Sequence, residues 1–437
     1  MMPAITTQEL RIHNSDLFNR MVDENATYVG LSRTSPWIDD NAPPDIYDSI
    51  EDRVLAYQEL VGMKRVLSTN IRSVLPRIDW VYNTIYDQYE SDVDMINQRT
   101  TSGQFIKFYV ITDEFNVYKC LSNANGSRST VKPSGTAVNP ITTSDGYIWK
   151  YMYTVKSTDA TGFMTTAWIP CYTLYTNDGS AQWIVQQSAV PGSIEVCVVD
   201  DPGINYTEEP TVTIIGDGTN ATARATFDPV TGLVTSVYIV NPGSNYTYAN
   251  VVISDGGGVG ALASAVISPL SGHGSDARVE LGATYKMIRL TFDSDEGGKF
   301  SVDTSYRQAM IVMNPLSTTT GTLLIVNDSH LYVKGETITG STSGAYGVVA
   351  AVDTTRNWIY VTSVVGAFLI NESVSSQDYN SQVVNGLQLS RNVPLSASVV
   401  ASSEVIANSG SVIYMSKREP ITRHPDQVEE GRFVVAF

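Results

Sequence analysis

The sequence predicts an α+β protein that is predominantly β, with a few N-terminal helices and a discontinuous β-rich core domain carrying small inserted β modules. Three observations lead to this fold class. Short β-type runs separated by polar turns dominate the chain after residue 80. Two internal repeats with β-type patterns lie in its central and later parts. Helical periodicity is confined to the first 80 residues.

The helical signal begins at Asp45, which can cap a helix. Apolar residues then follow at spacings of four, four, three and four, which places them on one helical face. These residues are Ile46, Ile50, Val54, Tyr57 and Val61. The apolar residues of Met63–Leu75 predict a second short helix, which Pro76 ends.

Strands are expected where bulky apolar and β-branched residues run or alternate between polar turns. Phe105–Ile111 and Val117–Leu121 are two such runs. Residues 122–144 are rich in Ser, Thr, Asn, Gly and Pro and are expected to form a loop. Tyr147–Val155 follows this loop as a third strand.

Two β runs close the sequence, Ser411–Ser416 and Arg432–Phe437. The link between them is polar and contains Pro420 and Pro425. A strand that ends at the C-terminus can close a sheet in the same subunit or extend the sheet edge of a partner.

The most informative internal feature is a repeat with an offset of 40 residues, in which Asp201–Thr207 recurs as Asn241–Thr247. In each unit the Pro-Gly pair predicts a tight turn. Alternate alanines, 221, 223 and 225 in the first unit and 261, 263 and 265 in the second, predict a strand face packed closely on another layer. Two such units make a small β module, and residues 181–275 hold eight acids and one base, hence −7 of the net charge of −17.

A second, weaker repeat aligns Leu331–Ile338 with Ala367–Val374 at an offset of 36 residues. Each copy contains a glutamate, Glu336 and Glu372. Two carboxylates can form a catalytic pair in a glycosidase. Their equivalence in a repeat instead favours a repeated structural role at a turn.

Composition excludes several classes of protein. The chain has 28 Lys and Arg against 45 Asp and Glu, so it lacks the basic excess expected of a free-standing nucleic-acid binder. No stretch resembles the roughly 20 apolar residues of a membrane span. Hydrophobic residues make up 42% of the chain, which argues against a disordered protein. Three widely spaced cysteines without a CxxC pair are typical of a reducing compartment, and the N-terminus does not resemble a signal peptide.

No group of residues converges on a known chemistry. The four histidines are scattered without zinc-ligand spacing, and the glycine-rich residues 256–260 lack the Lys-Ser/Thr of a phosphate loop. Asp293–Gly297 resembles the start of a calcium loop but lacks the later ligands. We therefore expect a protein without enzymatic activity, cofactor or bound metal.

Several blocks in a shared order resemble the baseplate wedge proteins of T-even-type contractile-tail bacteriophages, the products of gene eight. They are Ser32–Trp37, Val66–Trp80, Tyr118–Leu121, Asp145–Tyr151, Tyr306–Gln308 with Asn314–Leu316, and Ile413–Phe437 with its Arg418, Pro420-Ile421, Asp426-Gln427 and Glu429-Glu430. The chain is longer than the family, and the excess lies in the two repeat regions. Wedge core would then be 1–187, 277–317 and 386–437, with β modules inserted at 188–276 and 318–385.

The resemblance implies a non-enzymatic subunit of the virion tail baseplate, which assembles with other wedge proteins as a homodimer. Composition and charge predict that it contacts neither nucleic acid nor membrane. Charge is scarce, so Arg33, Arg77, Asp79 and Arg418 are candidate contacts with partners or salt bridges within the fold. The further candidate interface or motif residues are Trp37, Trp80, Trp149, Arg307, Tyr414 and Phe437. For Trp37, Trp80, Trp149 and Tyr151, a place in the core is expected rather than a contact with a partner. The alternatives are a host-surface module whose inserted repeats bind glycans, and a tail depolymerase.

Overall fold

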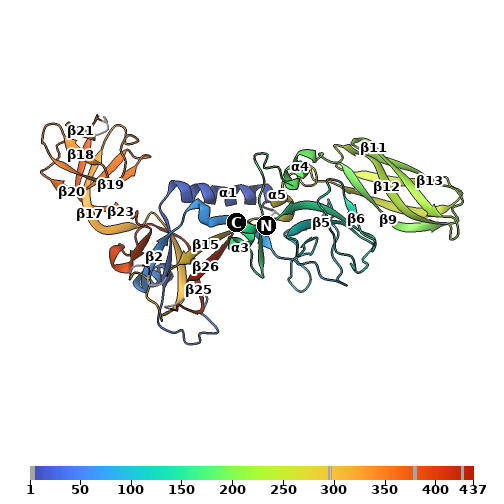
Figure 1. Ribbon diagram of the computed structural model, residues 1–437, viewed down its shortest axis with the longest axis horizontal. Helices are drawn as coiled ribbons and strands as arrows, with labels where there is room; N and C mark the ends of the chain where they lie inside the picture. The colour runs from blue at the N-terminus through green and yellow to red at the C-terminus, as the bar shows by residue number, and fades with distance from the viewer. Residues whose placement is uncertain (1–4, 294–295, 297, 377–380, 425–427) are drawn as a thin grey trace. The chain divides into compact units, whose positions relative to one another are not determined.

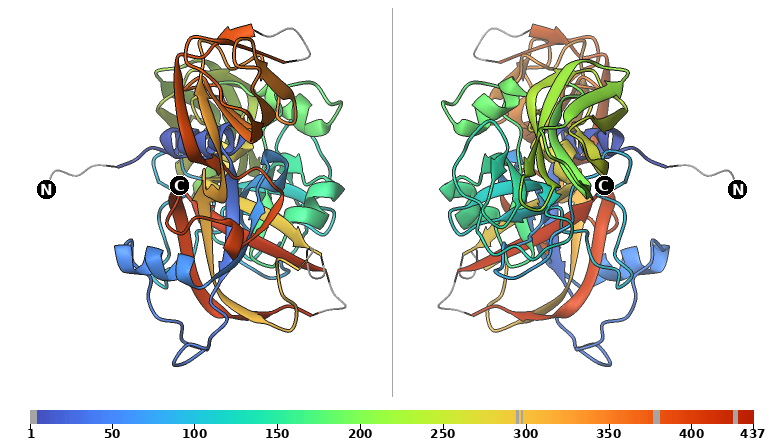
Figure 2. Two further views of the ribbon diagram at one scale, coloured as in Figure 1. Left: turned by 90° about the vertical axis from the view of Figure 1, so that its left-hand side faces the viewer. Right: turned by 90° about the vertical axis from the view of Figure 1, so that its right-hand side faces the viewer.

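Strands outnumber helices in the computed structural model, which describes residues 5–293, 296, 298–376, 381–424 and 428–437 (Figure 1). The rotated views show the same predominance of strands (Figure 2). The predominantly β fold class is therefore confirmed. The described helices are α1 (Gln8–Glu24), α2 (Ile50–Gln58), α3 (Ser157–Phe163), α4 (Ala181–Ser188) and α5 (Ala277–Leu281), with short 3₁₀ turns at Ser68–Asn70 and Ser402–Glu404.

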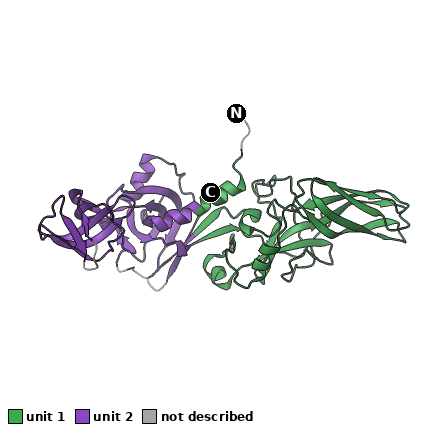
Figure 3. Cartoon of the chain, turned by 90° about the horizontal axis from the view of Figure 1, so that it is seen from above, with its two compact units in different colours: residues 1–16, 72–287, 434–437 green, residues 17–71, 288–433 purple. Residues whose placement is uncertain are grey.

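The chain divides into two compact units, each made of segments that are distant in sequence (Figure 3). Unit 1 comprises residues 1–16, 72–287 and 434–437, and unit 2 comprises residues 17–71 and 288–433. The finer division into three core segments and two inserted modules stays a prediction.

The main sheet of unit 2 joins segments from both ends of the chain. Its strand order is β24-β2-β1-β16-β25, and all neighbours are antiparallel. Tyr28, Met63 and Met310 are fully buried in the core that covers this sheet. The strands are β1 (Thr27–Ser32), β2 (Leu60–Arg65), β16 (Ser305–Met313), β24 (Val399–Ala401) and β25 (Ser411–Thr422).

The predicted helix over Met63–Leu75 is wrong, because this segment forms the end of β2, a 3₁₀ turn and β3 (Ile71–Pro76). An apolar run of this length fits a buried strand as well as a helix. Here Val74 and Leu75 are both fully buried although they point to opposite sides of the strand, and β3 pairs with β8 (Trp168–Pro170). Burial on both faces accounts for the apolar pattern.

The first predicted helix exists but is shorter than expected. α2 begins at Ile50 behind a Ser49 cap, whose hydroxyl accepts from the Asp52 amide, so Asp45 is not the cap. Ile50 is 83% exposed and Val61 lies in β2, so the apolar stripe does not form one buried face. The longer helix α1 was not predicted, because its apolar residues are few and are interspersed with charged ones.

Two of the strands predicted in the middle of the chain, Val117–Leu121 and Tyr147–Val155, are confirmed, whereas Phe105–Ile111 forms a strand only at Tyr109–Ile111. Unit 1 contains a sheet in the order β4-β5-β7-β6, which packs around Trp149 and its neighbours. The strands are β4 (Tyr109–Ile111), β5 (Asn116–Asn123), β6 (Ile141–Thr142) and β7 (Tyr147–Thr154).

Both predicted C-terminal strands are present, as β25 and β26 (Glu429–Ala436). Pro420 lies inside β25 rather than in the link, whereas Pro425, Asp426 and Gln427 lie outside the described residues. β26 neighbours β15 (Tyr285–Phe292) in the sheet order β26-β15-β3-β8, so the last strand closes a sheet of its own chain.

The 40-residue repeat folds as two three-stranded units that exchange strands. β9 of the first unit pairs with β14 of the second, β12 of the second pairs with β11 of the first, and β10 pairs with β13. The strands are β9 (Ile194–Ile204), β10 (Thr211–Gly216), β11 (Thr219–Asp228), β12 (Leu233–Ser244), β13 (Ala249–Ser254) and β14 (Val259–Ile267).

The exchanged pairs keep the repeat's offset residue by residue. Ala221 opposite Pro242 corresponds to Ala261 opposite Pro202, and both ladders shift register at equivalent positions. The Pro-Gly pairs therefore lie at the ends of β9 and β12 rather than in the predicted turns. The predicted close packing of the alanines is confirmed where it is strongest, since Ala225 is fully buried.

Two tyrosines of the repeat, Tyr206 and Tyr246, each pack against a glycine of the opposite unit. A Cβ atom added to Gly218 would lie 2.4 Å from the Tyr246 ring, and one added to Gly258 would lie 2.4 Å from the Tyr206 ring. Each tyrosine thus covers a glycine of the other unit, and both rings are buried (3% and 4% exposed). Neither unit can complete its core alone.

The second repeat forms a seven-stranded sheet in the order β22-β21-β18-β19-β20-β17-β23. Equivalent strands again meet, because β18 pairs with β21 and β17 pairs with β20. The strands are β17 (Leu316–Ile325), β18 (Thr337–Gly340), β19 (Tyr346–Asp353), β20 (Trp358–Val365), β21 (Ser373–Ser376), β22 (Ser381–Val383) and β23 (Gly386–Pro394).

The equivalent glutamates of this repeat bind turns. The carboxylate of Glu336 accepts from the backbone N–H of Val333, and that of Glu372 accepts from the N–H of Leu369, in each case three residues earlier. Glu372 also accepts from the N–H and hydroxyl of Ser343, both at 2.9 Å. The predicted structural role at a turn is confirmed.

The strand exchange predicts matched effects for Tyr206→Ala and Tyr246→Ala. Each change removes a buried ring from the other unit's glycine, so each should lower the free energy of unfolding of the module by roughly 3–5 kcal/mol. Tyr248, which is 59% exposed, provides the control, since Tyr248→Ala should change this free energy by less than about 0.5 kcal/mol. Urea unfolding followed by amide hydrogen exchange within residues 194–267 measures both. Loss of protection in only one unit would contradict the exchange.

Candidate functional site

Three of the candidate residues lie in one cluster of unit 2. Arg33 donates from Nη1 to both carboxylate oxygens of Glu59 (2.8 and 3.0 Å), and its guanidinium carbon lies 3.8 Å from the centre of the Trp37 ring. Arg307 donates from Nε and Nη2 to the two carboxylate oxygens of Asp40 (2.8 and 2.7 Å). Arg33 therefore forms a salt bridge within the fold, which was one of its two expectations, and Arg307 forms another.

The candidates of unit 1 also contact one another or the core. Arg77 donates from Nε and Nη2 to the carboxylate of Asp79 (3.0 and 2.9 Å) and from Nη1 to the carbonyl of Thr165 (3.0 Å). The Trp80 indole N–H donates to the Ser129 hydroxyl at 3.0 Å. Trp149 is fully buried and stacks on Tyr147, with ring centres 5.4 Å apart, so it is a core residue.

The remaining candidates lie in the C-terminal strands. Arg418 and Tyr414 are half-buried residues of β25, and the Arg418 carbonyl accepts the Trp37 indole N–H at 3.1 Å. The backbone N–H of Phe437 donates to the Thr284 carbonyl at 3.2 Å. Among the described residues Arg418 forms no ion pair, which distinguishes it from Arg33, Arg77 and Arg307.

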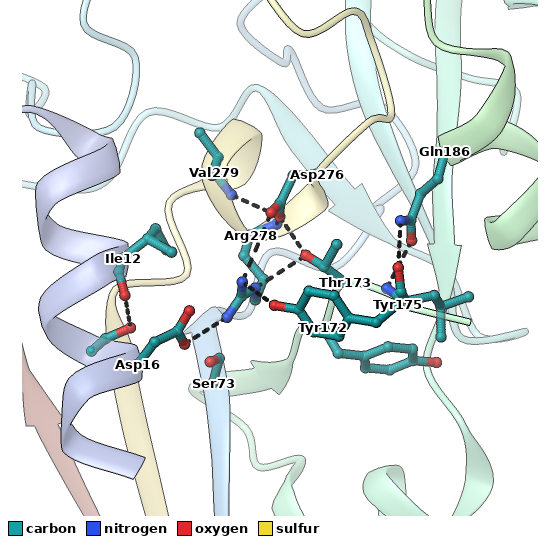
Figure 4. A network of polar contacts seen from close by, with 12 residues as sticks. Ile12, Asp16, Ser73, Tyr172, Thr173, Tyr175, Gln186, Asp276, Arg278 and Val279 are labelled. Atoms are coloured by element: carbon teal, nitrogen blue, oxygen red, sulfur yellow. Dashed lines mark hydrogen bonds and ion pairs between the residues drawn. The ribbon is translucent and has the colours of Figure 1, made fainter. Parts of the chain in front are cut away.

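Sequence reasoning missed a polar network in unit 1 that is centred on Arg278 (Figure 4). Arg278 donates to the Asp16 carboxylate (2.7 Å), the Thr173 hydroxyl (3.0 Å) and the Tyr175 hydroxyl (3.1 Å). Asp276 caps α5 by accepting from the Arg278 N–H (2.9 Å) and also accepts from the Thr173 hydroxyl. Residues from α1, α5 and a loop after β8 are thereby tied together.

A second missed feature is a fully buried group of Lys119, His273 and Glu280. The Lys119 ammonium donates to Glu280 Oε2 (3.1 Å), contacts His273 Nδ1 (3.2 Å) and lies 3.5 Å from the centre of the Tyr89 ring. Glu280 Oε1 accepts from the Gly274 N–H at 2.7 Å. His273 and Glu280 lie 154 and 161 residues after Lys119 in the sequence, and no linear pattern marks such a contact.

In this group, the buried charges of Lys119 and Glu280 compensate each other. Burial lowers the pKa values of Lys119 and His273. Burial opposes ionisation of Glu280, but the adjacent Lys119 outweighs it and holds the pKa of the carboxyl below its usual value. The side chains of Lys119 and Glu280 are 0% and 1% exposed, so no substrate can reach them, and their role is to hold β5 against α5.

Three further observations bear on function. Within the described part of the chain, no three His, Cys, Asp or Glu side chains are grouped to hold a metal ion. Of Asp293–Gly297, the calcium-like segment, residues 294, 295 and 297 lie outside the described residues. No described helix has both the length and the apolar character needed to cross a membrane.

The repeat tyrosines do not offer a glycan platform, since Tyr206 and Tyr246 are buried. Glycan binding would need an exposed aromatic surface that the repeats present. In the described residues of the first module, the aromatic side chains that are well exposed are Tyr238 and Tyr248. The two glutamates of the second repeat bind backbone N–H groups rather than facing each other as a catalytic pair.

Breaking the buried pair with Lys119→Met should lower the free energy of unfolding by about 3–5 kcal/mol, because Glu280 is left as an uncompensated buried charge. Adding Glu280→Gln should restore part of this loss. Lys132→Met is the matched control, since the ion pairs of Lys132 with Asp113 and Glu114 are exposed and should contribute almost nothing. Urea unfolding measures the free energy of unfolding of the three variants. An equal loss for Lys119→Met and Lys132→Met would show that the buried pair is no more important than the exposed one.

The Arg307 pair predicts a specific dependence on pH. Hydrogen bonds from Arg307 lower the pKa of Asp40 to about 2, below the value of about 3.9 in an unfolded chain. The pair therefore stabilises the fold fully above about pH 4 and loses its contribution as the pH falls towards 2. Asp40→Asn should flatten this part of the curve of urea midpoint against pH. Parallel curves for the variant and the parent would show that the pair does not titrate in this way.

Comparison with known proteins gives one informative similarity. No family model matches the chain. The chain is 24% identical over 185 residues to baseplate wedge protein gp8 of Enterobacteria phage T4. The aligned region covers 35% of this chain and 55% of that protein, so the chain spans little more than half the length of this relative. This distant similarity supports a structural role in a phage baseplate.

Proposed function

We propose that the protein is a structural subunit of the phage tail baseplate wedge, which holds the baseplate periphery through protein–protein interfaces. It assembles with other wedge proteins, as a homodimer, in the virion tail, and takes part in the rearrangement of the baseplate on contraction. The observation that carries the proposal is the similarity to baseplate wedge protein gp8 of phage T4.

The surface beside the family-like blocks supports this proposal. In unit 2, the segment that follows Trp37 exposes Ile38, Tyr47 and Ile50. In unit 1, the segment that follows Trp80 exposes Val81, Tyr82 and Ile85. Aromatic and aliphatic side chains of this kind are enriched in the buried centres of protein interfaces. The motif residues themselves hold these segments in place through contacts within the chain.

The charged groups that lie at the centres of the networks described above are engaged within the fold, which agrees with a protein that acts through its surfaces. The buried charges of unit 1 are engaged with one another, and the repeat glutamates bind turns. An assembly protein needs broad, specific interfaces rather than a concave site. Low charge density lowers the cost of removing such surfaces from water.

The first module can be separated from this role by deletion, because its two ends meet. The Ser268 N–H donates to the Ser193 carbonyl at 2.8 Å, and the Gly192 N–H donates to the Pro269 carbonyl at 3.3 Å. A short Gly-Ser linker can therefore replace residues 191–269. The same deletion removes Glu195, which pairs with the buried Lys150 at 2.6 Å, so the shortened chain should also carry Lys150→Gln.

Phage that lack this protein should release particles without a complete baseplate, and the shortened chain should restore baseplate assembly. Electron microscopy of purified tails measures both outcomes. Intact baseplates in the absence of the protein would contradict the structural role. Particles that assemble with the shortened chain but no longer adsorb to the host would instead favour a host-binding function of the module.

A further inference from the structure

A cavity of about 290 Å³ opens in unit 2 beside Arg418. Its walls are mainly apolar and include residues of β1, β15, β16, β25 and β26, with Phe292, Tyr306, Ile421 and Phe433 among them. The volume is close to that of the smallest ligand-binding pockets in proteins. We call this space the Arg418 cavity.

The Arg418 cavity is positive in a chain whose net charge is −17. Three arginines line it, and two glutamates accompany them. Arg423 pairs with Glu429 at 2.9 Å, and Arg432 pairs with Glu430 at 2.9 Å. Arg418 is the arginine of this lining that has no carboxylate partner among the described residues.

The partners of Arg418 are weak for a half-buried cation, and the Tyr414 side chain is one of them. Its Nη2 donates to the Ser416 hydroxyl at 2.8 Å, its guanidinium lies 5.3 Å from the centre of the Phe433 ring, and its Nε is buried without an acceptor. Burial lowers the pKa of Arg418 from its usual value, although a guanidinium stays protonated in proteins. A charge taken out of water in this way is costly unless an opposite charge approaches it.

A second donor of the lining is also unsatisfied. Gln308 is 2% exposed, and its amide nitrogen has no acceptor. Buried amides are normally hydrogen-bonded, so two unpaired donors at one cavity are unusual. Both donors are complementary to an acceptor, and the fork of a guanidinium matches the two oxygens of a carboxylate.

The lining also favours a single negative charge over a phosphate group. Glu429 and Glu430 lie at the same cavity and would repel a dianion more strongly than a carboxylate. The apolar walls suit the hydrocarbon part of a ligand.

We propose that the Arg418 cavity binds a carboxylate carried on a short apolar group, namely an acidic side chain of a neighbouring protein, with Arg418 as its anchor. The identity of the neighbour as an assembly partner rests on the proposed structural function. The binding chemistry itself does not depend on it.

The probe for the site is 3-phenylpropanoate, with the neutral 3-phenylpropanamide as its counterpart, titrated into the full-length protein by calorimetry or ligand-observed NMR. The wild type should bind the carboxylate saturably and the amide not at all. Arg418→Gln should weaken binding by about tenfold to a hundredfold, and Arg418→Lys should weaken it less. Arg391→Gln, at an exposed position outside the cavity, should leave binding unchanged.

Absence of saturable binding to the wild type, equal binding of the amide, or equal binding to Arg418→Gln would overturn the site. Arg418→Lys guards against misfolding, because it keeps the positive charge and the volume of the side chain. In phage, Arg418→Gln should lower incorporation of the chain into tails relative to Arg391→Gln. If both variants are incorporated equally, the carboxylate that binds the cavity does not come from an assembly partner. If the wild-type chain itself is missing from tails, the proposed structural function is wrong, but the binding result still holds.

Discussion

The pairing of β16 on both of its edges is the constraint on which unit 2 depends. β16 pairs with β1 from the N-terminal part of the chain and with β25 from the C-terminal part. Everything that lies between these strands in sequence must therefore begin and end close to the sheet. A long intervening segment meets this requirement if its two ends lie close together. Such a segment is tolerated because the entropic cost of closing a loop rises only slowly with loop length. The second repeat meets it by folding on itself between Leu316 and Pro394, which pair with each other.

In unit 1, segments that are distant in sequence are joined by backbone hydrogen bonds and by ion pairs. The ends of the first repeat module meet through Ser193 and Ser268, and the segments around it are joined by Lys119 with Glu280 and by Arg278 with Asp16. Buried ion pairs are weak sources of stability but strongly penalise any arrangement in which one partner is missing. In a chain with few charges they therefore specify which segments meet. In unit 2, Arg418 has no carboxylate partner among the described residues, and it lines the cavity described above.

Features that are local or repeated in the sequence could be predicted from it. The strands β5 and β7 follow from their own residues, and the 40-residue repeat indicated a two-unit module whose alanines pack closely. The exchange of strands between the units could not be predicted, because the same pattern is compatible with two separate hairpin-like units. The helix expected over Met63–Leu75 was wrong because burial on both faces of β3 imitates helical spacing. The candidate arginines were identified by their scarcity, but their partners Glu59 and Asp40 depend on the tertiary fold.

The central claim is that this chain is a structural part of a baseplate, built to be surrounded by other proteins. A cryo-electron microscopy map of the intact contractile tail tests it most directly. The account predicts density for the chain in the baseplate periphery, with Ile38, Tyr47 and Ile50 of unit 2 and Val81, Tyr82 and Ile85 of unit 1 covered by neighbouring subunits. Density for the chain elsewhere in the particle, or these side chains facing solvent in the assembled baseplate, would contradict it.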